Sequence, residues 1–215
     1  MDRNSPGSAM RDPAMRTRIN WQRLAREVGS IHRSGERGGS GLASIALERI
    51  LGEAELRAAV DYCVSGRPGA QLANSVLCLV RSWTAMKRCY EIFRSREDER
   101  RRVAAVGLLS HMGDERVLQW VGEFLADPAP GVQTCGMSIL DQMIEGWTVL
   151  PAEVKRLVRE AARHPNERVR ELAESIAWRI GERRRLASVL RRARPRNWPG
   201  SLESQRARAR TRHRE

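Results

Sequence analysis

The sequence has few of the residues that build β-sheets and no apolar run long enough to cross a bilayer. Aromatic residues make up 5% of the 215 residues, and Ala, Leu, Val, Arg and Glu fill long stretches, a composition that favours helices. The longest apolar run, near residues 76–80, is far shorter than the ~20 residues of a transmembrane helix. The first ten residues lack the apolar segment of a secretory signal. We therefore expect an all-α cytoplasmic protein that does not associate with membranes.

Patterns typical of catalysis or metal binding are also missing. No histidine stands at a ligand spacing such as H-E-x-x-H, and no two cysteines form a CxxC pair. The glycine-rich stretch at 34–41 lacks the Lys-Ser/Thr ending of a phosphate-binding loop. We expect no catalytic residue, no metal, no cofactor and no enzymatic activity. The residues considered are His32, His111, His164 and His213, and the thiols Cys63, Cys78, Cys89 and Cys135, of which Cys78 is the one expected at the surface.

Lysine is almost absent, since 37 of the 39 basic residues are arginine, and the charge is uneven. Residues 1–39 carry +4, residues 40–181 sum to zero, and residues 182–215 carry +9. Two explanations stay open: the flanks bind nucleic acid weakly and without sequence preference, or a GC-rich coding sequence has produced the arginines. The tail residues that would contact phosphates are Arg183, Arg184, Arg185, Arg191, Arg192, Arg194, Arg206, Arg208, Arg210 and Arg212.

A repeat runs through the neutral middle of the chain. The segment "DPAPGVQTCGMSILDQM" at 127–143 aligns with "HPNERVRELAESIAWRI" at 164–180 after a shift of 37 residues. Further shifts of 31 and 32 residues align 98–113 and 68–80 with them. Apolar residues recur at helical spacing in every copy, which predicts an amphipathic helix with one buried stripe. A small residue that allows close helix contact recurs in each copy, at Ala73, Ala105, Gly136 and Ala173.

Shorter helices between these copies align as well, in rows such as Leu56, Met86, Val117 and Val154. About four helix pairs result, at spacings of 30 to 37 residues, and this period predicts an α-solenoid. We expect the repeats to fill residues 40–181, with a capping helix at 42–51. A flexible basic arm with a short helix would precede them (1–39), and a basic helix and a disordered tail would follow (182–215).

The strings "DPAPGVQTCGMSIL" and "HPNERVRELAESI" resemble the second helix of HEAT repeats, in particular the short bacterial type similar to the PBS-lyase HEAT-like repeats of phycobilin lyases. "REDERRRVAAVGLL" matches the same pattern less closely. The resemblance covers roughly residues 53–181. It implies a solenoid whose second helices form a concave face. It says little about activity, because the scaffold also carries DNA glycosylase-like and bilin lyase-like enzymes.

The predicted function is a non-enzymatic interaction module, monomeric, that binds a protein partner on the concave face. Outward positions of the second helices mix polar and apolar residues without one charge sign, which suits a protein better than a phosphate backbone. The alternatives are non-specific nucleic-acid binding by the arginine-rich flanks and an enzyme on the same scaffold. The predicted contact residues are Asn74, Ser75, Val106, Ser110, Met137, Asp141, Gln142, Glu174 and Trp178.

Overall fold

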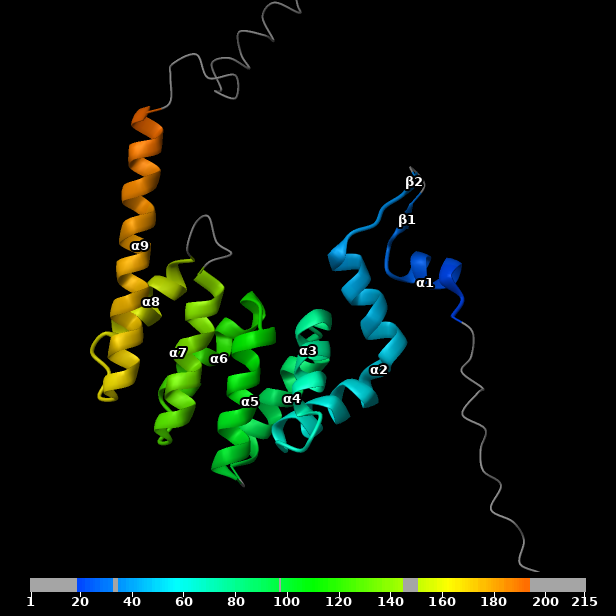
Figure 1. The fold of residues 1–215 in the computed structure, drawn as a ribbon, viewed down its shortest axis with the longest axis horizontal. Helices are drawn as coiled ribbons and strands as arrows, with labels where there is room; N and C mark the ends of the chain where they lie inside the picture. Colours follow the sequence, from blue (N-terminus) through cyan, green and yellow to red (C-terminus); the bar gives the residue numbers. More distant parts are fainter. Residues whose placement is uncertain (1–18, 33–34, 97, 145–150, 194–215) are drawn as a thin grey trace, which may run out of the picture. The chain divides into compact units, whose positions relative to one another are not determined.

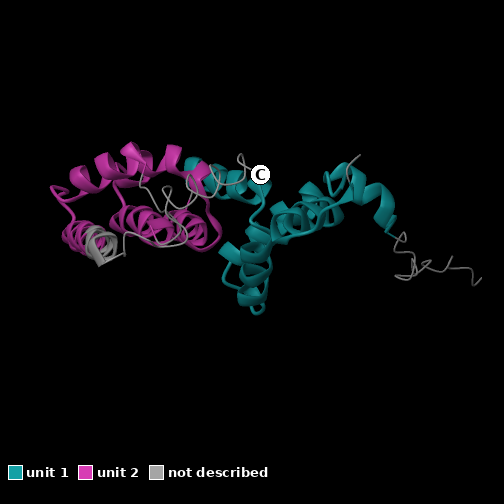
Figure 2. Cartoon of the chain, turned by 90° about the horizontal axis from the view of Figure 1, so that it is seen from above, with its two compact units in different colours: residues 1–95 teal, residues 96–215 magenta. Residues whose placement is uncertain are grey.

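The computed structural model describes residues 19–32, 35–96, 98–144 and 151–193. These residues are mostly helical, as the composition predicts, and their strands are limited to one short pair. Within the described ranges, no helix is both long enough and apolar enough to cross a membrane. The chain divides into two compact units, residues 1–95 and 96–215, which Figure 2 colours separately. The boundaries expected near residues 40 and 181 mark changes of charge and stay predictions.

Unit 1 begins with the short helix expected on the N-terminal arm, α1 (Trp21–Glu27). The side chain of Asn20 caps it by accepting a hydrogen bond from the backbone N–H of Arg23 at 2.9 Å. An antiparallel pair follows, β1 (Ile31–His32) and β2 (Gly35–Glu36). The sequence predicts a flexible arm over residues 1–39. These two-residue strands were not anticipated, because runs so short have no period.

Three further helices complete unit 1: α2 (Ser40–Val64), α3 (Ala70–Val80) and α4 (Trp83–Ser95). Helix α2 bends at Gly52, whose φ of 79° favours glycine. Its first arm spans residues 42–51, where the sequence predicts a capping helix, and its second arm begins where the predicted repeats begin. Helix α2 packs on both α3 and α4.

The buried side of α3 differs from the prediction. The alignment assigned Leu72 and Val76 to the buried stripe, yet their exposed fractions are 71% and 37%. Leu77 and Val80 are buried instead. Both sides of this helix are apolar, so the periodicity alone could not identify the side that α2 covers.

Unit 2 contains two layers of helices, visible in magenta in Figure 2. Helices α5, α7 and α9 lie side by side in one layer, and α6 and α8 pack against them in the other (Figure 1). The elements are α5 (Glu99–Met112), the 3-10 turn η1 (Glu115–Val117), α6 (Leu118–Leu125), α7 (Pro130–Ile144), α8 (Ala152–Ala161) and α9 (Glu167–Ala193).

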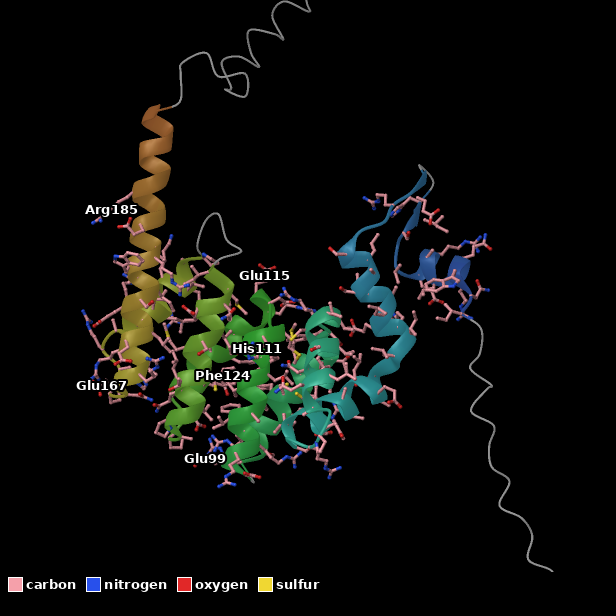
Figure 3. All side chains as sticks on the ribbon, viewed as in Figure 1. Glu99, His111, Glu115, Phe124, Glu167 and Arg185 are labelled. Atoms are coloured by element: carbon pink, nitrogen blue, oxygen red, sulfur yellow. The ribbon has the colours of Figure 1, made fainter. Side chains whose placement is uncertain are left out.

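The aligned rows of the sequence form the core between these layers. Val117 and Val154 are buried, as are the small residues Ala105, Gly136 and Ala173. Two other buried members of the rows are Phe124, labelled in Figure 3, and Ala161. Helix α9 continues through Gly181 to Ala193, so the change of charge at residue 182 does not end a helix.

Candidate interaction surface

The helix starts of unit 2 are fixed by capping side chains. Asp98 accepts a hydrogen bond from the backbone N–H of Arg100 at 2.8 Å, and Asn166 accepts one from that of Arg168 at 3.0 Å. Asp127 accepts one from the N–H of Ala129 at 2.9 Å, just before α7. These contacts set where each helix of the layer begins.

A set of side-chain contacts recurs from one helix of this layer to the next. Arg102 of α5 forms a buried ion pair with Asp127, which precedes α7. Gln133, one repeat later, donates to the Asp127 carbonyl at 2.7 Å and accepts from the Asn166 side chain at 2.8 Å. Arg170, the equivalent residue of α9, donates to the carbonyl of His164 at 2.8 Å. The same position of the repeat therefore holds the interhelical loops in the three copies of unit 2.

His164 is part of these loop contacts. Its Nδ1 lies 3.1 Å from the backbone N of Asn166, and its Nε2 lies 2.9 Å from the carbonyl of Leu125. A ring protonated at Nε2 satisfies both contacts, because Nδ1 then accepts and Nε2 donates. His164 thus joins two loops. Among the described residues, no three His, Cys, Asp or Glu side chains gather so as to hold a metal ion.

The seam between α5 and α7 consists of small and apolar residues. A Cβ atom placed on Gly131 would lie 2.9 Å from Cγ2 of Val103, and one on Gly107 would lie 3.6 Å from Sγ of Cys135. Val103 and Gly107 therefore mark the side of α5 that faces α7, whereas Gly131 and Cys135 mark the side of α7 that faces back to α5.

In the next seam, Asp141 of α7 forms an ion pair with Arg179 of α9. Asp141 aligns with Trp178, 37 residues later. In the described part of the chain α9 is the last helix of its layer, and Trp178 is 67% exposed. Trp178 therefore lies on the side of α9 that corresponds to the seam-facing side of α7.

This arrangement corrects part of the predicted contact surface. Val106 and Met137 are fully buried, so the interpretation of these two residues as an exposed face was wrong. In the same row, Glu174 on the last described helix is exposed. Ser110 and Asp141 are half-buried, Gln142 and Trp178 are exposed, and in unit 1 Asn74 is half-buried and Ser75 is exposed on α3.

The thiol expected at the surface is half-buried. Cys78 donates a hydrogen bond to the side-chain oxygen of Asn74 at 3.3 Å. Burial raises the pKa of Cys78, and it also raises the pKa of Cys63 and Cys135. The pKa of the fully buried Cys89 is raised well above its ordinary value. The thiolate forms are therefore disfavoured, and this argues against nucleophilic chemistry at these cysteines.

The predicted phosphate-contacting residues fall partly on α9. Arg185 is exposed and forms an ion pair with Glu182 at 2.9 Å; Figure 3 labels Arg185 and Glu167 toward opposite ends of the helix. The backbone of α9 also includes Arg183, Arg184, Arg191 and Arg192. Outside the described residues lie Arg194, Arg206, Arg208, Arg210 and Arg212.

The exposure of two leucines of α3, Leu72 and Leu79, does not follow from the repeat pattern of the sequence. The absence of any charged residue in α3 was a signal available in the sequence.

The chain matches no model of a known protein family, no curated protein and no solved structure.

Proposed function

We propose that residues 53–181 form a HEAT-like α-solenoid that serves as a protein-interaction module without an active site of its own. Two features of unit 2 support this. Its helices form two layers, and equivalent side chains hold successive loops in each copy. Stacked helix pairs offer extended side surfaces to partners, and binding is the common use of that geometry.

The binding surface we propose is the terminal face of α9, made by Glu171, Glu174, Ser175 and Trp178. The exposure of Trp178 (67%) is the single observation that carries this proposal. Tryptophan buries a large area at little entropic cost and is enriched among residues that dominate binding energies. The aligned positions in α5 and α7 lie in seams between helices. The terminal face is thus a seam that no helix of the described residues fills, and a partner would fill it.

Quantitative affinity capture with the full chain tests this function. We expect Trp178→Ala to reduce recovery of the specific partner at least tenfold, as loss of a central anchor of ~2 kcal/mol or more would do. The matched control is Trp21→Ala, because Trp21 is similarly exposed (65%) but lies on α1 in unit 1. Equal recovery by the two variants would mean that the captured protein does not bind the terminal face.

A second candidate function, weak nucleic-acid binding, has one observation in its favour. Helix α9 runs twelve residues beyond Gly181, from Glu182 to Ala193, into the segment 182–215 that carries +9. Such a segment attracts phosphates without reading bases. This activity is compatible with a protein-binding terminal face, since α9 contributes to both.

A further inference from the structure

Helix α3 carries an exposed apolar face that its own unit leaves open. Leu72 and Leu79 are 71% and 72% exposed, and Ser75 lies between them on the same side of the helix. None of the 11 residues of α3 is charged, although 30% of the chain is. Ser44 of α2 donates to the carbonyl of Leu79 at 3.2 Å, so α2 contacts the backbone at the C-terminal end of α3 and leaves the Leu79 side chain exposed. Contiguous exposed apolar residues of this kind mark an interaction site.

The repeat register identifies which side of α3 is exposed. Leu72 aligns with Cys135, whose sulfur lies against Gly107 of the preceding helix. Leu79 aligns with Arg179, which pairs with Asp141 of the preceding helix. By this register Leu72 and Leu79 lie on the side of the helix that in α7 and α9 receives the helix before it.

The terminal face of α9 is the complementary half of such a seam. Trp178 aligns with Asp141, and Ser175 aligns with Gly107. In the seam between α7 and α9 of one chain, Asp141 lies opposite Arg179. If the α3 face met the terminal face in the same register, Leu79 would take the place of Arg179 and Trp178 the place of Asp141. Asp141 and Arg179 are both charged, whereas Trp178 and Leu79 are both apolar and exposed. This matched change is what a seam between two separate chains would require.

We propose that a second copy of this chain docks its α3 face on the terminal face of α9. The inference rests on the proposed interaction function and names the partner. Such a contact is head-to-tail, joining two different surfaces. The absence of charge on α3 avoids like-charge contacts between molecules that each carry +13. This proposal of self-assembly differs from the monomer that we expected from the sequence.

One residue limits the strength of this contact. Glu174 occupies the register of Val106 and Met137, which are fully buried in unit 2. Docking would remove water from its carboxylate, and this opposes association. We therefore expect assembly that depends on concentration, and Glu174→Leu should tighten it by roughly tenfold.

Sedimentation velocity of the full chain at rising concentration tests the proposal. The wild type should form dimers and larger species, and Leu79→Glu and Trp178→Glu should each be monomeric. An equimolar mixture of these two variants should form dimers and stop there, because only one chain keeps each intact face. The control is Trp21→Glu, which should assemble like the wild type. Circular dichroism establishes that each variant keeps its helices.

Three results would overturn the proposal: a wild type that stays monomeric at every concentration, a mixture that stays monomeric, or a Trp178→Glu variant that still assembles. The last would indicate symmetric pairing of α3 with α3. Suppose that the wild type is monomeric and that Trp178→Ala loses a partner captured by the wild type. Self-assembly would then be rejected, and the proposed interaction function would stand. The reverse outcome is equal capture by the Trp178→Ala and Trp21→Ala variants together with self-assembly of the wild type. It would reject a different protein as the partner of the terminal face and leave self-assembly standing.

Discussion

Gly136 of α7 lies directly against Phe124 of α6. A Cβ atom placed on Gly136 would stand 2.7 Å from Cβ of Phe124 and 3.6 Å from its carbonyl carbon. Real side chains do not approach so closely, and the contacted atoms belong to the start of a buried side chain and to backbone, which cannot move aside. The glycine therefore sets the distance between the two layers of unit 2.

Replacing Gly136 with alanine should lower the free energy of unfolding by about 1–3 kcal/mol, because the added methyl group forces α6 and α7 apart. The matched control is Gly122→Ala on α6, where a Cβ atom would meet nothing within 4 Å. That change should be neutral or stabilise by up to ~1 kcal/mol through helix propensity. Urea unfolding of both variants measures the difference, and equal stabilities would mean that Gly136 is not at a helix contact.

The alignment predicted the close contact at Gly136 but could not predict the exposed side of α3. Gly136 falls among helices where polar residues mark the solvent side, so its burial follows from periodicity. In α3 both sides are apolar, and only the position of α2 decides between Leu72 and Leu77. The buried Val106 was missed for a related reason. A helix within a layer has neighbours on both sides, and a single-stripe model does not include the second neighbour.

The buried ion pair of Arg102 and Asp127 should contribute more to stability than an exposed one. Arg102→Leu leaves a buried carboxylate without its counter-charge, at a cost of about 3–5 kcal/mol. Adding Asp127→Asn should recover part of this loss, because no buried charge remains and the amide oxygen still accepts from Ala129.

The exposed pair of Arg116 with Asp114, at 2.6 Å, is the matched control. Arg116→Leu should cost less than about 1 kcal/mol. Urea unfolding of the three variants decides the matter: a cost for Arg102→Leu no larger than that for Arg116→Leu would contradict a structural role for the buried pair.

Glu91 of α4 should stabilise unit 1 only above acidic pH. Hydrogen bonds from Arg57 at 2.6 Å and from Arg88 at 3.1 Å lower its pKa from the ordinary 4.5, with Arg57 as the largest cause. A lowered pKa in the folded state means that the stabilisation is complete above pH 4.5 and is lost as the pH falls through the lowered value. Because Glu91 is partly exposed, the effect is below about 1 kcal/mol.

Thermal melts of wild type and Glu91→Gln at several pH values measure this effect. The variant should be the less stable protein at pH 7, and the two curves should converge as the pH falls below 4.5. A difference that persists unchanged into the acidic range would show that the carboxylate charge is not its cause.

The arginine-rich C-terminal segment should bind duplex DNA and RNA weakly and without sequence preference. If about six of its arginines reach phosphates, log affinity should fall against log salt concentration with a slope near −5. Fluorescence anisotropy with two unrelated duplexes measures the slope. A chain truncated after Gly181, which loses the +9 segment, should not bind, provided that circular dichroism shows the remaining helices intact. Undiminished binding by the truncated chain would instead place the site on the repeats.

Hydrogen–deuterium exchange measures directly whether the terminal face of α9 is an interaction surface. Exchange is compared for the full chain at low and high concentration and in the presence of any protein captured through Trp178. We expect slower exchange in peptides covering residues 167–182, with α8 unchanged as the internal reference. Slower exchange elsewhere in the chain, with residues 167–182 unaffected under both conditions, would contradict it.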